Sequence, residues 1–213
     1  MKNLQSQGLW SNFYDLTQIP RPSGQKEEVS AFLANYGRSL GLETIVDEIG
    51  NVIIRKPASA GYENHPGVIL QGHMDMVPQK NNDTVFDFAK DPIEAYIDGE
   101  WVTAKGTTLG ADNGIGVAAA MAILADKNVV HPPLEVLVTV DEETGMYGAF
   151  ALEGGLLQGK TLLNLDSEAE GELYVGCAGG VDTTAKFAYT PVEVEEGDVA
   201  VKVSVTGCKG GHS

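Results

Sequence analysis

Apolar residues recur along the chain with two spacings, one typical of helices and one typical of strands. A helix is predicted over residues 24–40, because apolar side chains fall there at i, i+3, i+4 and i+7 positions: Val29, Phe32, Leu33, Tyr36 and Leu40. Ser23 can cap this helix and Gly41 can end it. The pattern also predicts an earlier helix over 4–17 and an alanine-rich helix over 113–125.

Short apolar runs between these segments predict strands. The predicted strands cover 43–47, 51–55, 67–72, 134–140 and 161–165, with a hairpin formed by 94–97 and 100–104. Strands that alternate with helices are typical of the α/β class. We therefore expect a mostly parallel central sheet flanked by helices.

The pattern changes after about Val181. An acidic connector beginning at Pro191 is followed by Val199, Val201, Val203 and Val205, which alternate with small or polar residues. Such alternation predicts a strand with one buried face, typical of an antiparallel sheet. The chain is accordingly predicted to hold a first domain at 1–182 and the beginning of a second at 183–213.

Composition narrows the classes of protein. The net charge of −16 argues against nucleic-acid binding, because an acidic surface repels phosphates. No apolar run reaches the roughly 18 residues of a membrane span, and the N-terminus lacks a secretory pattern. The chain has two cysteines, Cys177 and Cys208, which give no disulfide framework and favour a reducing cytoplasm. Neither lies in a CxxC pair, which argues against a redox or zinc-ribbon role.

Side chains that can bind metal lie just beyond three predicted strands and just before one predicted helix. They are His73, Asp75, Asp112, Glu142, Glu143 and Asp166. Because sites in α/β sheets form beyond the carboxyl ends of strands, we expect these side chains to converge. Clustered carboxylates repel one another unless a cation neutralises them. Imidazole and carboxylate ligands suit Zn²⁺, Mn²⁺ or Co²⁺.

Spacing suggests how these residues divide the work. His73 and Asp75 are two positions apart, so Asp75 can orient the imidazole. Glu142 and Glu143 are adjacent and point differently, so one can bind metal while the other acts as a general base. Asp112 is the candidate carboxylate to bridge two metals roughly 3.5–4 Å apart. Each residue alone is more simply a structural histidine, a solvated strand end or a turn residue, but their combination favours a metal site.

Four motifs carry a resemblance to a known family: QGHMDMVPQK at 71–80, GTTLGADNGIG at 106–116, DEETGM at 141–146 and NLDSE at 164–168. They resemble the aminoacyl-histidine dipeptidases, also called Xaa-His dipeptidases or cytosol non-specific dipeptidases of PepD type. These belong to the co-catalytic zinc peptidases, which include carboxypeptidase G-like enzymes, aminoacylases and carnosinases. The resemblance runs through essentially the whole chain, including DGEW at 98–101 and GCAGG at 176–180.

The resemblance implies a role for each residue. His73 and Asp166 correspond to ligands of one metal, Asp112 to the bridging carboxylate and Glu143 to a ligand of the second metal. Glu142 corresponds to the general base and Asp75 to the acid that orients His73. His212, in the motif GGHS at 210–213, corresponds to a lid-domain histidine that stabilises an oxyanion. In many relatives that histidine comes from the partner subunit, which implies a homodimer through the lid.

The resemblance also implies a reaction, the metal-dependent hydrolysis of dipeptides, with a dipeptide substrate and no nucleic-acid or membrane partner. Two divalent ions are expected in the complete enzyme, zinc first, with cobalt or manganese as alternatives. The family takes a further histidine ligand from beyond the segment that matches this chain. We therefore expect an incomplete catalytic domain at 1–182, a truncated lid at 183–213, one filled metal site, and little or no activity of the isolated chain.

Two other functions remain open. A related deacylase, tripeptidase or carboxypeptidase would share the metal residues and differ in its specificity pocket. A non-catalytic metal-binding module would share only the ligands. His65 and His131 match no ligand position and are expected to be structural or exposed.

Overall fold

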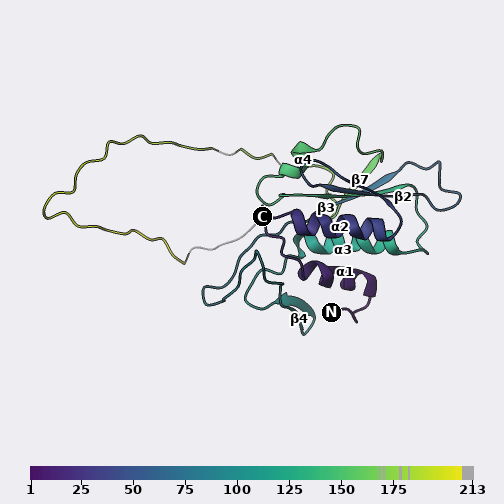
Figure 1. Cartoon of the computed structure of the whole chain (residues 1–213), viewed down its shortest axis with the longest axis horizontal. Coiled ribbons are helices and arrows are strands. Elements are labelled where there is room, and N and C mark those ends of the chain that lie inside the picture. Colours follow the sequence, from purple (N-terminus) through teal and green to yellow (C-terminus); the bar gives the residue numbers. More distant parts are fainter. Residues whose placement is uncertain (168, 170, 178, 182, 208–213) are drawn as a thin grey trace. The chain divides into compact units, whose positions relative to one another are not determined.

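The computed structural model of the chain describes residues 1–167, 169, 171–177, 179–181 and 183–207. The chain divides into two units, Met1–Glu172 and Leu173–Ser213. The first unit holds every helix and strand of the described residues (Figure 1). None of these helices is both long and apolar enough to cross a membrane.

A five-stranded sheet forms the centre of the first unit, in the order β1-β2-β6-β3-β7. Its strands are β1 (Glu43–Val46), β2 (Val52–Lys56), β3 (Val68–His73), β6 (Leu134–Thr139) and β7 (Thr161–Asn164). Strand β3 pairs in parallel with β6 and β7, while β2 pairs antiparallel with β1 and β6. The predicted α/β class is confirmed. The parallel part of the sheet consists of β6, β3 and β7, the strands that precede most of the candidate ligands.

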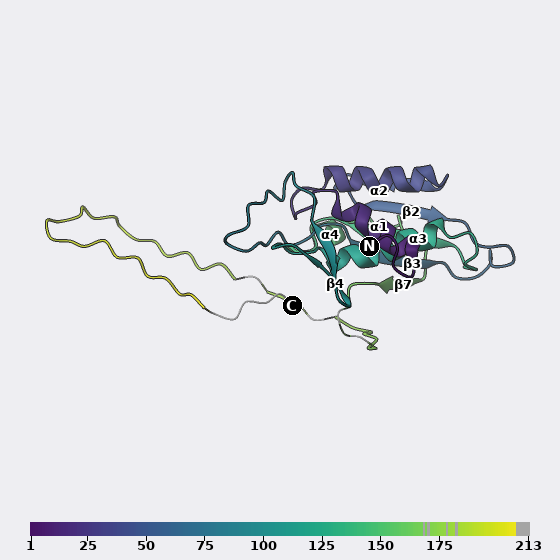
Figure 2. The same cartoon turned by 90° about the horizontal axis from the view of Figure 1, so that it is seen from below.

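Three helices cover one face of this sheet (Figures 1 and 2). They are α1 (Gln7–Thr17), α2 (Glu27–Ser39) and α3 (Ala111–Ala125). Their buried faces form one core with alternate residues of the strands: Phe13, Leu33, Val117, Met121, Val52, Ile54, Leu70, Val136 and Val138. Alternate strand residues share a face because the side-chain period of a strand is two.

The intervening strand residues face the other side and form a smaller cluster. Ile53, Ile69 and Leu137 are buried there, against Leu152 and Leu156. These leucines follow α4 (Tyr147–Ala151), a helix that the sequence did not predict. A helix of five residues that contains a glycine and buries only Gly148 gives no periodic signal.

The predicted boundaries are close to the observed ones. Gly41 follows α2 with φ of 72°, a conformation that glycine adopts without steric cost, as predicted for the end of this helix. The prediction that Ser23 caps α2 is wrong, because the helix begins at Glu27 after Lys26 and has no side-chain cap. The hydroxyl of Ser23 donates instead to Asp75, 2.7 Å away.

The predictions for the hairpin, for His65 and for His131 are confirmed. The hairpin consists of β4 (Ala95–Asp98) and β5 (Trp101–Ala104). His131 is buried with its Nδ1 2.8 Å from the carbonyl oxygen of Pro132, and His65 is exposed and stacks on Tyr62. Neither histidine lies in the groups of residues that could hold a metal.

The second unit contains no helix or strand among its described residues. The predicted strand at 199–205 is therefore wrong, and its valines are 81–88% exposed. A strand requires a hydrogen-bonding neighbour and a surface against which to bury one face, and the described part of this unit provides neither. The assignment of 1–182 and 183–213 to a catalytic and a lid domain stays a prediction.

Candidate metal centre

The candidate ligands lie at one edge of the sheet, beyond the carboxyl ends of its parallel strands. His73 is the last residue of β3, Glu142 and Glu143 follow β6, and Asp166 follows β7. Asp112 lies in the first turn of α3, where its backbone is not helical (φ −83°, ψ 113°). Parallel strands end at the same edge, so residues far apart in the sequence meet there.

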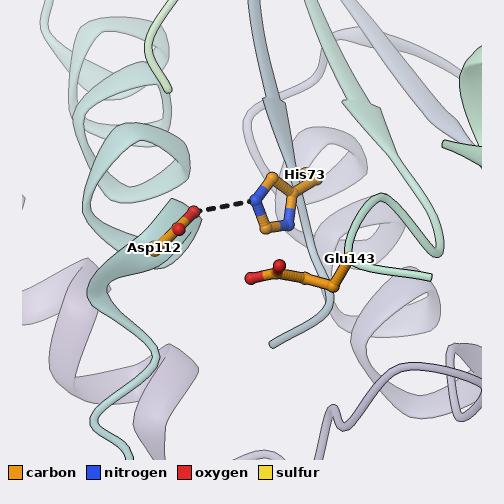
Figure 3. Close-up of side chains that lie close together, drawn as sticks. All are labelled: His73, Asp112 and Glu143. Carbon is orange, nitrogen blue, oxygen red and sulfur yellow. Dashed lines mark hydrogen bonds and ion pairs between the residues drawn. The ribbon is translucent and has the colours of Figure 1, made fainter. Parts of the chain in front are cut away.

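The imidazole of His73 is the centre of this cluster. Its Nε2 lies 3.0 Å from Oδ1 of Asp112, 3.6 Å from Oδ1 of Asp166 and 3.9 Å from Oε2 of Glu142. Figure 3 shows the side chains of His73, Asp112 and Glu143 pointing toward one another from β3, α3 and the loop after β6. Ligand atoms lie within 4.8 Å of one another in two groups, His73 with Asp112 and Glu143, and His73 with Glu142 and Asp166.

Asp75 lies on the opposite side of the imidazole. Its Oδ1 is 3.3 Å from Nδ1 of His73, and both side chains are almost fully buried. The same carboxylate accepts hydrogen bonds from the backbone N–H groups of Glu142, at 3.0 Å, and Glu143, at 3.3 Å. The hydroxyl of Ser23 supplies another donor at 2.7 Å. One buried carboxylate therefore fixes the histidine ring and the loop that carries both glutamates.

Electrostatics favour the charged forms of His73 and Asp75. Burial alone would lower the pKa of His73, but Asp166 and Asp75 outweigh it and raise this pKa to about 11. Burial raises the pKa of Asp75, but the donors His73, Ser23 and the N–H of Glu142 together bring it below its ordinary value. The ring and its orienting carboxylate thus stabilise each other as an ion pair.

The other carboxylates differ from one another. Burial, and then a hydrogen bond shared with Asp166, raise the pKa of Asp112. Hydrogen bonding to His73 lowers the pKa of Asp166 despite partial burial. Burial raises the pKa of Glu142, with Asp166 and Asp75 adding to the effect and His73 opposing it. Repulsion within a cluster of acids separates the pKa values of its members in this way.

The donor set fits a divalent metal. It consists of one imidazole and several carboxylates, whose side chains are partly exposed at Asp112 (42%), Glu142 (32%) and Asp166 (25%). Nitrogen and oxygen donors of this kind suit Zn²⁺, Mn²⁺ and Co²⁺, and exposure on one side gives a metal ion access. A divalent cation would also offset the repulsion that raises the pKa of Asp112.

Asn113 supports this centre, although the sequence assigned it no role of its own. Its side-chain amide donates to the carbonyl oxygen of Leu165 at 2.9 Å and to Oδ1 of Asp166 at 2.8 Å. The side chain is buried at the start of α3. Asn113 therefore ties the segment after β7 to the helix that carries Asp112.

Arg21 is a second supporting residue that the sequence did not single out. It is 2% exposed, yet it is a cation, because burial lowers its pKa only to about 10. Asp75 and Asp112 partly offset the cost of burial through their negative charge. The remaining sequence candidate, His212, lies outside the described residues.

An α/β sheet that gathers a histidine and several carboxylates at its carboxyl edge is typical of metal-dependent hydrolases. A family model described as peptidase family M20/M25/M40 matches residues 69–206. The chain belongs to this peptidase family. The match includes every residue of the centre described above, from His73 to Asp166.

Individual members of the family show which proteins the chain is similar to. The chain is 54% identical to the cytosol non-specific dipeptidase of Escherichia coli (strain K12) over 213 residues, which are 100% of this chain and 44% of that protein. The crystal structure of aminoacylhistidine dipeptidase from Vibrio alginolyticus matches with a TM-score of 0.81 at 55% identity, covering 83% of this chain and 36% of that one. Aminopeptidase PepT from Bacillus cereus ATCC 10987 matches with a TM-score of 0.65 at 26% identity, covering 78% and 44% of the two chains.

Proposed function

We propose that this chain carries the metal-binding and acid–base residues of a metal-dependent dipeptidase that hydrolyses Xaa-His and other dipeptides. The observation that carries the proposal is the convergence of four carboxylates on the imidazole of His73 at one edge of the sheet. The names of the Escherichia coli and Vibrio alginolyticus relatives support a dipeptide substrate. The chain spans 44% of the length of the Escherichia coli relative. Dipeptide hydrolysis by a whole protein is therefore proposed as well.

The proposed ligands divide between two ions, with zinc as the expected metal and cobalt or manganese as alternatives. His73, Asp112 and Asp166 would hold one ion, and Asp112 and Glu143 would contribute to the second. The position of Asp112, 3.0 Å from Nε2 of His73 and grouped with Glu143, supports its role as a shared ligand. When bound, such ions act as Lewis acids on the scissile carbonyl and lower the pKa of a water molecule. In the chain as it stands, the first site is expected to fill.

Glu142 is proposed as the general base. Its raised pKa and partly exposed side chain suit a group that accepts a proton from water and later releases it. The water oxygen forms a bond to the peptide carbonyl carbon as Glu142 takes the proton. When the C–N bond breaks, Glu142 returns that proton to the leaving amine. Asp75 keeps the loop of Glu142 in place through its backbone N–H.

Several finer points belong to the same proposal. Residues 1–182 form the catalytic part and 183–213 begin a lid through which two subunits pair. His212 stabilises the oxyanion of the tetrahedral intermediate. The cytoplasm is the expected location, supported by the name of the cytosol dipeptidase relative.

A chimera tests the proposal directly. Residues 1–213 of this chain are joined to the remainder of the Escherichia coli relative, to which they are 54% identical. The purified chimera is loaded with zinc and given β-Ala-His, Gly-His, a tripeptide and an N-acetylated amino acid. We expect dipeptide hydrolysis by the chimera and little or none by the 213-residue chain.

The matched variant is Glu142→Gln in the same chimera. It keeps the size and removes the base, so we expect unchanged metal content and a loss of kcat of about 10² to 10⁴. Near-normal turnover by this variant would show that Glu142 is not the base. Preferential cleavage of the tripeptide or the N-acetylated substrate would replace the dipeptidase proposal with the related peptidase or deacylase.

A further inference from the structure

The segment 21–24, which joins α1 to α2, contacts three of the loops around the candidate metal centre. Its backbone pairs with Met76 beyond β3, through Met76 N–H to the carbonyl of Arg21 at 3.1 Å and Ser23 N–H to the carbonyl of Met76 at 3.2 Å. The N–H of Gly24 donates to Oδ1 of Asp141, beside the two glutamates, at 2.6 Å. The sequence motifs of the centre include no residue of the segment 21–24 itself.

Arg21 connects the residues that follow His73 to the residue that precedes α3, the helix that carries Asp112. Its Nη1 donates to the carbonyl oxygen of Met74 at 2.9 Å and to that of Asp75 at 3.3 Å. Its Nη2 donates to the carbonyl oxygen of Gly110, at the start of α3. A planar guanidinium with fixed donors can bridge several acceptors at once, which an ammonium group does less well.

The space around this guanidinium is closed. A Cβ atom at Gly110 would lie 2.5 Å from Nη2, and one at Gly114 would lie 2.7 Å from it. Both distances are too short for a real contact, so only glycine lets α3 approach Arg21 this closely. The start of α3 therefore packs directly against the buried guanidinium, which also bonds to the segment after β3.

Ser23 acts on the same region through a side chain. Its hydroxyl donates to Oδ2 of Asp75 at 2.7 Å, while Oδ1 of that carboxylate lies 3.3 Å from Nδ1 of His73. The orientation of the Asp75 carboxylate thus depends on the segment 21–24 as well as on the ring it contacts.

We propose that Arg21 and Ser23 are positioning residues that set the spacing between the candidate ligands His73 and Asp112. The inference rests on the proposed metal-dependent function and names two further residues for it. Neither residue contacts substrate or metal in this proposal. Each acts through backbone carbonyls or through Asp75.

Two measurements on the 213-residue chain test it, with the variants Arg21→Lys, Arg21→Met and Ser23→Ala. The first is the zinc dissociation constant. The variant His73→Ala lacks a candidate ligand, so any zinc that it still binds is bound outside the candidate centre. Loss of groups that orient metal ligands weakens metal binding by about 10- to 100-fold, which is the expected effect of Arg21→Met and Ser23→Ala. Arg21→Lys keeps the charge without the fork of donors, and we expect it to bind zinc more weakly than wild type too.

The second measurement is amide hydrogen exchange at Glu142 and Glu143 in the presence of a chelator. These N–H groups donate to Asp75, so both positions should exchange several-fold faster in the Arg21 and Ser23 variants. This readout needs no metal and reports on loop placement alone. Ser23→Ala is a small change and keeps the test usable if Arg21→Met does not fold.

Matched controls lie away from the centre. Arg55→Met removes an arginine that pairs with Glu135 near the opposite end of the sheet, and Ser30→Ala removes a hydroxyl that donates to the carbonyl of Gly50. Both should lower stability without weakening zinc binding or changing exchange at 142–143.

The outcomes separate this inference from the proposed function. Equal zinc affinity and equal exchange in the wild type and the Ser23 and Arg21 variants would overturn the positioning role. Full recovery of affinity by Arg21→Lys would overturn the bridging argument and leave charge alone as the effect. If the wild type binds no zinc but exchange still rises in the variants, the positioning of these loops holds and the metal-dependent function fails.

Discussion

Removal of the Asn113 side chain tests whether the centre is held together by its hydrogen bonds. Asn113 is 2% exposed and donates to the backbone carbonyl of Leu165 and to the carboxylate of Asp166. A neutral hydrogen bond contributes about 0.5–1.5 kcal/mol, and one to a charged group about 1.5–3 kcal/mol. Asn113→Ala loses both and also removes Oδ1, a buried acceptor without a hydrogen-bond partner among the described residues, which offsets part of the loss.

We therefore expect Asn113→Ala to lower the free energy of unfolding by about 2–3 kcal/mol. The assay is urea unfolding of the 213-residue chain with a chelator present, followed by tyrosine and tryptophan fluorescence and by circular dichroism. Asn12→Ala is the matched control, because the bond from the amide of Asn12 to the carbonyl of Ala118 is longer, at 3.3 Å, and lies away from the candidate ligands. The control should lose less than about 1 kcal/mol.

The variant Asn113→Asp gives a second, independent test, based on how stability depends on pH. Asn113→Asp would face Asp166 with a like charge, so it should be less stable than Asn113→Ala at neutral pH and recover as the pH falls and one acid is protonated. If Asn113→Ala costs no more than Asn12→Ala, the hydrogen bonds of Asn113 do not hold Asp166 against α3, and the reasoning is refuted.

Two further predictions concern the proton balance and the core. Zinc binding at neutral pH should release about one proton from His73, because the pKa of this residue is raised to about 11, and zinc affinity should therefore rise with pH. Calorimetry in two buffers of different ionisation enthalpy measures the proton release. Identical binding heats in the two buffers would contradict the prediction. Leu33→Ala, at a fully buried position of α2, should lower the free energy of unfolding in urea by about 2–5 kcal/mol. Leu40→Ala, at a 37% exposed position, should lower it clearly less. Equal losses in the two variants would contradict the assigned core.

The sheet edge and the positions of the candidate ligands could be predicted because their signals are local. Strand β6 is buried along its whole length, so its sequence LEVLVT is mostly apolar, and the acids that follow it mark its end. Strand β3 gives the same signal and ends at His73. The positions of the ligands then follow from the rule that parallel strands end at one edge.

The supporting residues could not be predicted because their contacts are distant in the sequence. Arg21 bonds to residues 53, 54 and 89 positions away, and no periodicity links them. Ser23 gave a helix-cap signal that was locally sensible, but its hydroxyl bonds to Asp75 instead. Tertiary contacts decided both cases against the local preference.

The predicted strand at 199–205 failed for a related reason. Alternation of valine with polar residues favours a half-buried strand, but the strand forms only if it pairs with a neighbouring strand and buries one face. Among the described residues of the second unit, these valines are exposed and have no neighbouring strand. Periodicity alone does not provide the partner.

The central claim is that His73 and the carboxylates around it form a divalent metal site. Zinc titration of the chelator-treated 213-residue chain, followed by calorimetry, tests it most directly, with Asp112→Asn compared against the exposed Asp98→Asn. The account predicts a saturable site in the wild type and in Asp98→Asn, and a large loss of affinity in Asp112→Asn. Equal zinc affinity in all three proteins, or no binding by the wild type, would contradict it.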